Sequence, residues 1–473
     1  MRSYRGTNTI LRYPSPMTAD PTFRLNGDVV ALAGTDPTLS LLRWLKRRRL
    51  HGTKEGCADG DCGACTVALV EREADGRARY RAVNSCLLPM GQMPGREVLT
   101  VEALADGAAL HPVQQALVDA GGSQCGYCTP GFVMSLFVGH AHGELDDHTT
   151  EGNLCRCTGY RPIRAATQAL AAQARASDRL QAALASAHAP LASAALARFH
   201  SPVTIDEALA LKARHPLATW VAGATDLGVT LSHGEAVAPA FIALDRIAAL
   251  KVLRIDAHAV TIGAGISLTR LQLELAGIFP ALDEMLRWFA ARQVRNRATL
   301  GGHLGSASPI GDQLPVLLAL AATVHCQGPR GTRTLPIDSY FEGYRRTARA
   351  EDELITAVTL PRDPVRRDAA YKVAKRPSDD ISIVAAAFAL RFDAARRIDH
   401  ARLAYGGVAA TPVRATATEA FLLGKPLDAD VIAAAVERLQ AEFSPISDHR
   451  ASADFRRTLC GSLFARYARE HAP

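Results

Sequence analysis

No apolar run in this chain of 473 residues is long enough to cross a membrane, and we see no internal repeat. The first 20 residues contain arginines but no apolar core segment, so we do not expect a secretory signal. Arginines are scattered rather than grouped with aromatic residues, which make up only 6% of the chain. This pattern gives nucleic-acid binding little support. We therefore expect a cytoplasmic protein that acts neither on membranes nor on nucleic acids.

The composition is that of a soluble globular protein, with 48% hydrophobic and 21% charged residues and a modest net charge of +7. A chain of this length exceeds what one hydrophobic core supports, so we expect three or four domains. Residues 1–20 are expected to be a disordered extension or to reflect an upstream start, with an arginine-rich transit peptide as a further alternative. The Ala-, Ser- and Gln-rich stretch at 179–198 is expected to be a linker.

Short patterns predict the elements on either side of that stretch. Residues 21–95 show short strands, glycine-rich loops and one helix, and Asn26-Gly27 between apolar runs predicts a hairpin. Residues 96–175 predict helices, the first of them from Val101. Thr204-Ile205-Asp206-Glu207 has the form of a capping box before a helix. Near the end, residues 401–408 predict a strand and residues 431–443 a helix.

Eight of the ten cysteines form two sets of four. Cys57, Cys62, Cys65 and Cys86 follow the pattern C-x4-C-x2-C-x20-C, and C-x4-C-x2-C…C is the plant-type ferredoxin spacing for a [2Fe–2S] cluster. Glycines between the first three cysteines permit positive φ angles and close approach of the backbone to a cluster. A zinc site is the alternative, although zinc sites usually pair cysteines as two close knuckles. We predict an iron–sulfur site.

The second set follows the pattern C-x2-C-x26-C-x-C and comprises Cys125, Cys128, Cys155 and Cys157. Each pair precedes a helical pattern with proline near its start. Thiolates at such positions face free N–H groups and the positive end of the helix dipole, which favours the ionised form. Two such helix starts brought together could hold a second cluster, with zinc again the alternative.

Disulfides are not expected for either set, because cytosolic proteins rarely keep structural disulfides. Cys326 and Cys460 are expected to be ordinary thiols. Two adjacent redox centres in one chain indicate a path for electrons.

Two later segments could bind a nucleotide. Residues 220–228 predict a strand leading into a turn of small residues, which lets backbone amides approach a pyrophosphate; a plain strand–helix turn is the alternative. Residues 298–312 are dominated by Gly, Ser and Ala and end in Asp312. They predict a long loop packed against a ligand, with Asp312 accepting from a ribose hydroxyl. A surface loop is the alternative there.

Taken together, these segments resemble the molybdenum hydroxylase family, and within it the iron–sulfur and FAD subunit of bacterial xanthine dehydrogenases. The resemblance covers roughly residues 21–410. It is carried by GTKEGCADGDCGACTV, GSQCGYCTPGFVMS, GNLCRCTGYRPI, LRWFAARQVRNRATLGG, SASPIGD and YKVAKRPSDDIS.

The resemblance implies a multidomain α+β fold. It consists of a β-grasp [2Fe–2S] ferredoxin domain at 21–95, a helical-bundle [2Fe–2S] domain at 96–178, a two-part FAD-binding domain of the vanillyl-alcohol-oxidase type at 199–365, and a flavoprotein C-terminal domain at 366–473.

The resemblance also implies which residues contact FAD. They are Trp220, Val221, Ala222, Gly223, Ala224, Thr225, Asp226, Leu227, Phe289, Thr299, His303, Asp312, Ile355 and Lys372. Phe289 would lie against the flavin ring and Lys372 near its polar edge. His303 departs from the family pattern, which usually has Asn after the double glycine, and an imidazole is bulkier and titratable.

The function implied is that of an electron-transfer subunit of xanthine dehydrogenase. Electrons from a molybdopterin centre on a partner subunit would pass through two [2Fe–2S] clusters to FAD and on to NAD⁺ while hypoxanthine and xanthine are oxidised to urate. The chain itself would hold no catalytic residue for the substrate, and an (αβ)2 heterotetramer is implied. One alternative is a hydroxylase that has the same series of electron carriers and acts on an aldehyde or another N-heterocycle. A second is a non-catalytic electron-transfer protein.

Overall fold

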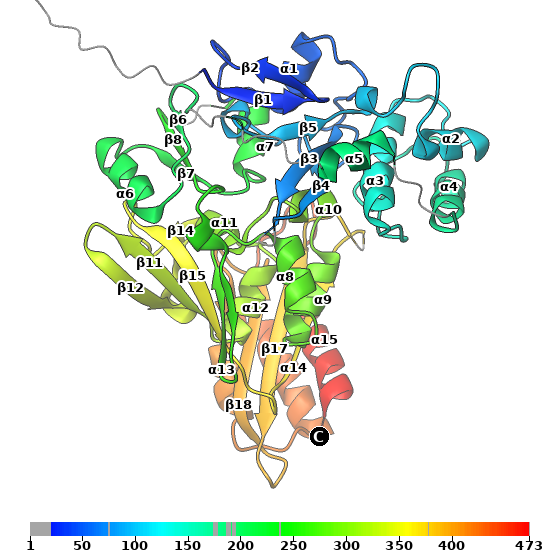
Figure 1. Ribbon diagram of the computed structural model, residues 1–473. Helices are drawn as coiled ribbons and strands as arrows, with labels where there is room; N and C mark the ends of the chain where they lie inside the picture. Colours follow the sequence, from blue (N-terminus) through cyan, green and yellow to red (C-terminus); the bar gives the residue numbers. More distant parts are fainter. Residues whose placement is uncertain are drawn as a thin grey trace, which may run out of the picture.

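The computed structural model describes residues 20–73, 76–173, 178–185, 191, 195–235, 238–376 and 378–472. The extension expected at 1–20 lies outside these residues, apart from Asp20. Figure 1 shows the N-terminal strands and helices at one end of an elongated molecule and the C-terminal sheet and helices at the other. Within the described ranges, no helix combines the length and the apolar character that a bilayer crossing needs.

The first unit, residues 20–99, is a five-stranded mixed sheet in the order β2-β1-β5-β3-β4. The predicted hairpin is confirmed, since β1 and β2 are antiparallel and joined by Asn26 and Gly27 with φ of 54° and 97°, values typical of a type I′ turn. The elements are β1 (Thr22–Leu25), β2 (Asp28–Ala31), α1 (Leu41–Arg47), β3 (Thr66–Arg72), β4 (Ala78–Asn84), η1 (Met90–Gln92) and β5 (Glu97–Leu99).

The second unit, residues 100–185, is a group of helices around the buried helix α3. Its elements are η2 (Val101–Ala103), α2 (Pro112–Asp119), α3 (Thr129–His142), α4 (Arg161–Ala171) and α5 (Arg179–Ala185). The helix expected from Val101 is only a single 3₁₀ turn. The stretch expected to be a linker begins with α5, where the backbone oxygen of Leu180 accepts a hydrogen bond of 2.8 Å from the Tyr80 hydroxyl.

The third unit starts with a parallel three-stranded sheet in the order β6-β8-β7. Its elements are β6 (Phe199–His200), α6 (Ile205–Arg214), β7 (Thr219–Val221), α7 (Leu227–Ser232) and β8 (Phe241–Ala243). The predicted cap is confirmed: the Thr204 side chain accepts from the Glu207 N–H. The Glu207 carboxylate in turn accepts from the Val203 N–H at 2.9 Å.

The third unit continues as an antiparallel five-stranded sheet in the order β12-β11-β15-β10-β9. The strands of this sheet are β9 (Leu253–Ile255), β10 (Ala259–Gly263), β11 (Thr323–Gly328), β12 (Gly331–Pro336) and β15 (Leu354–Pro361). A separate hairpin consists of β13 (Phe341–Gly343) and β14 (Arg346–Thr347). The helices of this part are η3 (Ala248–Lys251), α8 (Leu268–Glu274), α9 (Pro280–Trp288), α10 (Arg292–Arg295), α11 (Leu300–Ser306), α12 (Gln313–Ala319) and η4 (Ile337–Ser339).

The prediction of one long loop over residues 298–312 is wrong, because α11 occupies its middle. Thr299 caps this helix by accepting from the Gly302 N–H at 3.0 Å. A local cap of this kind satisfies one of the N–H groups left free at a helix start, and the low helix propensity of glycine is overridden by packing.

The C-terminal unit, residues 367–472, packs an antiparallel sheet in the order β16-β17-β18-β19 between helices. Strand β17 is buried on both faces: Ala385, Ala387 and Ala389 belong to the core of the third unit, whereas Phe388 and Leu390 belong to the core of the C-terminal unit. Its elements are β16 (Arg367–Val373), β17 (Val384–Phe392), β18 (Ile398–Gly406), β19 (Val413–Arg414), α13 (Thr416–Leu422), α14 (Ala429–Glu442) and α15 (Ala453–His471).

Candidate cofactor sites

The first four cysteines converge as two pairs in the loop between α1 and β3 and just after β4. The Cys57 N–H donates to Cys62 Sγ at 3.3 Å, and the Cys62 N–H donates to Cys57 Sγ at 3.4 Å. The sulfurs of Cys65 and Cys86 lie 3.3 Å apart. Two thiolates on one tetrahedral metal, with metal–sulfur bonds of about 2.3 Å, lie about 3.7 Å apart. The sulfur spacing of the second pair is therefore close to what one metal ion requires.

The loop also stabilises a thiolate. The hydrogen bond with Cys62 lowers the pKa of Cys57 to about 5, and backbone N–H groups, among them that of Asp59 at 3.3 Å from the sulfur, act in the same direction. N–H groups that point at cluster sulfurs are one of the means by which proteins adjust cluster potential. Such an environment favours the ionised ligand that a metal needs.

The second four cysteines form pairs in the helical unit. The sulfurs of Cys125 and Cys157 lie 3.6 Å apart and are exposed. Cys128 and Cys155 interact side chain to side chain, and Cys155 is buried.

Each cysteine pair of the second set was expected to lie directly before a helix, and only the first pair does so. Cys128 is the N-cap residue of α3, whereas α4 begins after Tyr160, three residues beyond Cys157. The N–H that reaches Cys155 Sγ, at 3.4 Å, is that of Thr158 in the loop before α4. The Thr158 hydroxyl donates to the same sulfur at 3.1 Å.

The paired arrangement fits a binuclear cluster. In a [2Fe–2S] cluster bound by four cysteines, each iron takes two protein thiolates. Each cysteine set supplies two such pairs. No disulfide joins any of the ten cysteines, all of which lie in the described part of the chain.

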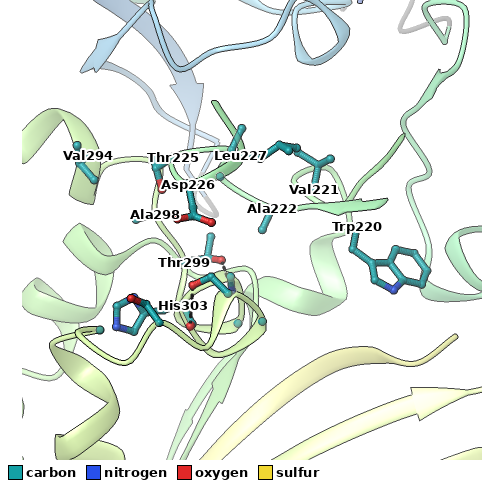
Figure 2. Close-up of a pocket in the computed structure, with 18 of the residues that line it drawn as sticks. Trp220, Val221, Ala222, Thr225, Asp226, Leu227, Val294, Ala298, Thr299 and His303 are labelled. Carbon is teal, nitrogen blue, oxygen red and sulfur yellow. Dashed lines mark hydrogen bonds between the residues drawn. The ribbon is translucent and has the colours of Figure 1, made fainter. Parts of the chain in front are cut away.

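A cavity of about 900 Å³ lies in the third unit, where it meets the first unit and β16. All fourteen residues expected to contact FAD line it. Figure 2 shows Trp220 and Val294 on opposite sides of the close-up, with the turn after β7 beside Thr299 and His303. A cavity of this volume can hold a dinucleotide.

The turn after β7 brings its backbone close to a neighbouring chain segment. Ala224 has a φ of 64°, an uncommon value for a residue with a side chain. A Cβ on Gly223 would lie 1.8 Å from the backbone oxygen of Arg297, so only glycine fits there. The turn lines the cavity, and a turn in which one residue has a positive φ is a backbone conformation that can bind anionic groups.

Buried polar atoms in the cavity wall lack protein partners. Trp220 Nε1 and His303 Nε2 are buried without a hydrogen-bond partner in the described part of the chain. Burial lowers the pKa of His303, and its ring meets that of Phe289 edge to face at 5.5 Å. A buried donor or acceptor left unpaired costs about 1–3 kcal/mol, so these atoms fit a site completed by a polar ligand.

Asp312 lies in the cavity wall, and both of its carboxylate oxygens accept hydrogen bonds from protein groups. It is only 4% exposed. One carboxylate oxygen accepts from Lys372 Nζ at 2.8 Å, and the other accepts from the Ser382 hydroxyl at 2.6 Å. Lys372 Nζ also donates to the backbone oxygen of Trp288 at 3.0 Å, beside Phe289. The carboxylate therefore holds Lys372 in the cavity wall, and Ile355 of β15 lies buried in the same wall.

The cavity has a second wall that the sequence analysis missed. Asp59, Asp61 and Leu87, which belong to the first cysteine region, also line it. Leu87 packs with Cys65 and Cys86 and with Val294 of α10. The cysteine set and the cavity therefore share a wall, and no pattern along the chain indicated this, since the two regions lie some two hundred residues apart.

Four family models match the chain in the order of these units. Residues 23–91 match a 2Fe-2S iron-sulfur cluster binding domain, and residues 100–168 match a [2Fe-2S] binding domain. Residues 194–363 match the FAD binding domain in molybdopterin dehydrogenase, and residues 369–471 match the CO dehydrogenase flavoprotein C-terminal domain. The chain belongs to the molybdenum hydroxylase family.

As a member of this family, the chain contains two 2Fe-2S domains and an FAD-binding domain, which confirms the expected multidomain α+β fold. The xanthine dehydrogenase of Emericella nidulans is 33% identical over 474 residues, covering 85% of this chain and 35% of that protein. That of Drosophila subobscura is 32% identical over 492 residues, covering 89% and 37%. The chain thus spans little more than a third of the length of these curated relatives.

Solved structures of other family members are similar over a shorter stretch. A carbon monoxide dehydrogenase from Hydrogenophaga pseudoflava matches with a TM-score of 0.54 and 29% identity, covering 56% of this chain and 94% of its own. Quinoline 2-oxidoreductase from Pseudomonas putida 86 matches with a TM-score of 0.54 and 26% identity, covering 57% and 95%. The family therefore includes proteins named for quite different substrates.

Proposed function

We propose that this chain is the iron–sulfur and FAD subunit of a xanthine dehydrogenase. In this proposal it carries electrons from a molybdopterin centre on a partner subunit through two [2Fe–2S] clusters to FAD, and on to NAD⁺, during the oxidation of hypoxanthine and xanthine to urate. The observation that carries the proposal is the wall shared by the first cysteine set and the cavity, in which Leu87 contacts both.

The assignment to xanthine dehydrogenase is supported by the extent of the matches. The xanthine dehydrogenases named above align with 85–89% of the chain, across its cysteine-rich and cavity-bearing units alike. The carbon monoxide dehydrogenase and quinoline 2-oxidoreductase chains cover 56–57% of it. A protein with both parts on one chain is the better template for this one.

We propose that the two cysteine sets are the cluster ligands. Cys57, Cys62, Cys65 and Cys86 would hold one cluster, and Cys125, Cys128, Cys155 and Cys157 the other. The support is their arrangement in pairs, including sulfur separations of 3.3 Å for Cys65–Cys86 and 3.6 Å for Cys125–Cys157.

We propose that the fourteen cavity residues bind FAD, a cofactor that joins one-electron carriers to two-electron acceptors. Turn 222–226 would hold the pyrophosphate with its backbone N–H groups, and His303 Nε2 and Trp220 Nε1 would each find a polar partner on the cofactor. Lys372, held by Asp312 and the Trp288 carbonyl, would present its positive charge to the flavin. Phe289 would keep water from one face of the ring.

We propose that the partner subunit docks at the second cysteine set. Cys125 and Cys157 are exposed there, and Tyr127 and Tyr160 are 49% and 38% exposed. Large exposed aromatic side chains are typical of interfaces. An Arg156→Glu variant should assemble poorly with the molybdopterin subunit; normal assembly and electron transfer would contradict this surface. An (αβ)2 heterotetramer in the cytoplasm is the assembly that we propose.

The experiment that tests the function is anaerobic addition of xanthine to the complex purified with its natural partner, followed by visible absorbance of the flavin and the clusters. We expect bleaching by xanthine and recovery on addition of NAD⁺. Bleaching by an aldehyde or quinoline but not by xanthine would show that the chain is a subunit of a different hydroxylase with the same electron carriers. Absence of bleaching by every substrate, with both clusters and FAD present, would favour a non-catalytic carrier.

A further inference from the structure

A buried polar junction joins the first, second and third units at one point. Gln293 of α10 reaches out of the third unit, and its Nε2 lies 3.2 Å from Asn153 Oδ1 and 3.2 Å from Ser135 Oγ in the helical unit. The same nitrogen lies 3.4 Å from Thr66 Oγ1 in the first unit. These four residues are all 2% exposed or less. These side chains are therefore shielded from bulk water.

Asn153 connects the two cysteine loops directly. Its Nδ2 donates to the backbone oxygen of Gly63 at 3.0 Å, and Gly63 lies between Cys62 and Cys65. The next residue, Leu154, donates its N–H to the backbone oxygen of Cys62 at 3.0 Å. Leu154 immediately precedes Cys155. One backbone hydrogen bond thus joins Cys62 of the first set to the residue that precedes Cys155 of the second set.

The junction has no spare room. A Cβ on Gly63 would lie 2.0 Å from the backbone oxygen of Gly152, and a Cβ on Gly152 would lie 2.1 Å from Gln293 Oε1. Gly63 also has a φ of 65°. Backbones in such contact can move relative to one another only if the side chains between them also move.

The same helix extends the junction to the cavity. Val294, next to Gln293, lines the cavity and packs with Cys65 and Cys86. Arg295 donates to the backbone oxygen of Phe289 at 2.7 Å and forms an ion pair with Glu151 of the helical unit. Three successive residues of α10 therefore contact the helical unit, the first cysteine set and the cavity wall.

We propose that Gln293 is a positioning residue that fixes the separation and orientation of the two cysteine loops, and thereby the electron transfer between the clusters bound there. It acts through Asn153, whose amide it orients toward Gly63. Electron transfer between two centres falls steeply with distance, so a small displacement of one loop is sufficient to slow it. The inference rests on the proposed function only in taking the cysteine sets as cluster sites.

The test uses the full chain with bound clusters and FAD, purified with its natural partner and reduced with dithionite. Two reduced [2Fe–2S] clusters are paramagnetic, and their mutual dipolar coupling, measured by low-temperature electron paramagnetic resonance, varies with the inverse cube of their separation. Gln293→Met keeps the length of the side chain and removes its donors. We expect the coupling to be weakened or lost and electron transfer between the clusters to slow, with iron and FAD content unchanged.

Gln313→Met is the matched control, because Gln313 of α12 is equally buried yet its side-chain atoms have no hydrogen-bond partner among the described residues. Its spectrum should equal that of the native protein. Ser135→Ala, which removes one acceptor of Gln293 and one donor to Asn153, should change the coupling in the same direction but less.

Unchanged coupling in fully loaded Gln293→Met would overturn the proposal. Loss of clusters in both Gln293→Met and Ser135→Ala, with Gln313→Met intact, would also overturn it and assign the junction a role in folding. Because reduction is chemical, the result does not depend on the substrate or on NAD⁺. A failure of the proposed xanthine dehydrogenase activity would therefore leave this test unaffected.

Discussion

Replacement of Asp245 by asparagine should loosen the first unit from the wall of the cavity. Asp245 follows β8 and forms ion pairs with Arg96 of the first unit and, at 3.3 Å, with Arg297. Arg297 also lies 3.4 Å from Gln92 Oε1, and Gln92 Nε2 donates to the backbone oxygen of Ala222 at 2.8 Å. The carboxylate therefore anchors a network that ends on the turn predicted to hold the pyrophosphate.

The size of the effect follows from burial. The side chains of Asp245, Arg96 and Arg297 are 11%, 15% and 6% exposed. Removal of one partner from a buried ion pair costs about 3–5 kcal/mol, because the remaining charge stays buried without compensation. Asp245→Asn leaves the Arg96 guanidinium in that state, whereas Arg297 keeps a second ion pair with Glu71 at 3.4 Å, so we expect a loss of about 3 kcal/mol in the free energy of unfolding.

The same network gives a dependence on pH. Burial alone would raise the pKa of Asp245, yet Arg96 and Arg297 lower it from 3.8 to about 2. A drop of this size corresponds to about 2 kcal/mol of stability. Because the pKa is lower in the folded protein, this contribution is complete above pH 4 and is lost as the pH falls toward 2. Asp245→Asn should lack this component of the acid sensitivity.

The assay is urea unfolding of the loaded protein, followed by the rise in flavin fluorescence as FAD is released. Asp245→Asn should lower the midpoint clearly at pH 7, and the gap to the native protein should narrow below pH 4. Asp352→Asn is the control, since the Arg330–Asp352 pair is exposed and should contribute little. Equal midpoints for Asp245→Asn and the native protein at pH 7 would refute the reasoning.

Cys157→Ser should remove only the second cluster, so that iron analysis gives half the native content while the signal of the first cluster persists; loss of both would contradict independent sites. Lys372→Met leaves the buried Asp312 without its cation and should weaken FAD retention and cost about 3–5 kcal/mol. Retention is measured by dialysis against a Lys375→Met control, and equal retention would argue against a role for Lys372. Burial raises the pKa of Asp379 from 3.8 to about 7, so stability is lost as the pH rises between these values. Asp379→Asn should then be more stable than the native protein at pH 8, by up to about 4 kcal/mol, and equal unfolding midpoints at pH 8 would contradict this.

The cysteine patterns were sufficient to predict that there are two sulfur-rich sites, because spacing limits how a short loop can wrap around a cluster. Spacing could not tell which thiols pair. Cys65 meets Cys86 across the strands β3 and β4, and Cys125 meets Cys157 across helix α3 and the loop that follows it. Pairing depends on how strands and helices pack, which a linear pattern does not contain.

For the glycine-rich segment 298–312, by contrast, the sequence predicted the wrong local structure. Its composition predicted a loop, and the low helix propensity of glycine supports that prediction. In the structure α11 forms because Thr299 caps it and Leu300 and Leu304 are buried in the core of the third unit. Composition also could not indicate that Lys372 and Ser382, 60 and 70 residues further on, would each donate to one oxygen of Asp312.

The sequence by itself determined the two cysteine sets, the Asn26-Gly27 hairpin, the Thr204 cap and fourteen of the residues that line the cavity, because these depend on local spacing, backbone preference or resemblance. Only the tertiary structure decided that Leu87 and Val294 join the first cysteine set to the cavity, and that Gln293 lies where three units meet. Glutamine carries no periodic or motif signal of its own. Its role depends on which partners folding brings within hydrogen-bond distance, and these lie 140 to 227 residues away in the chain.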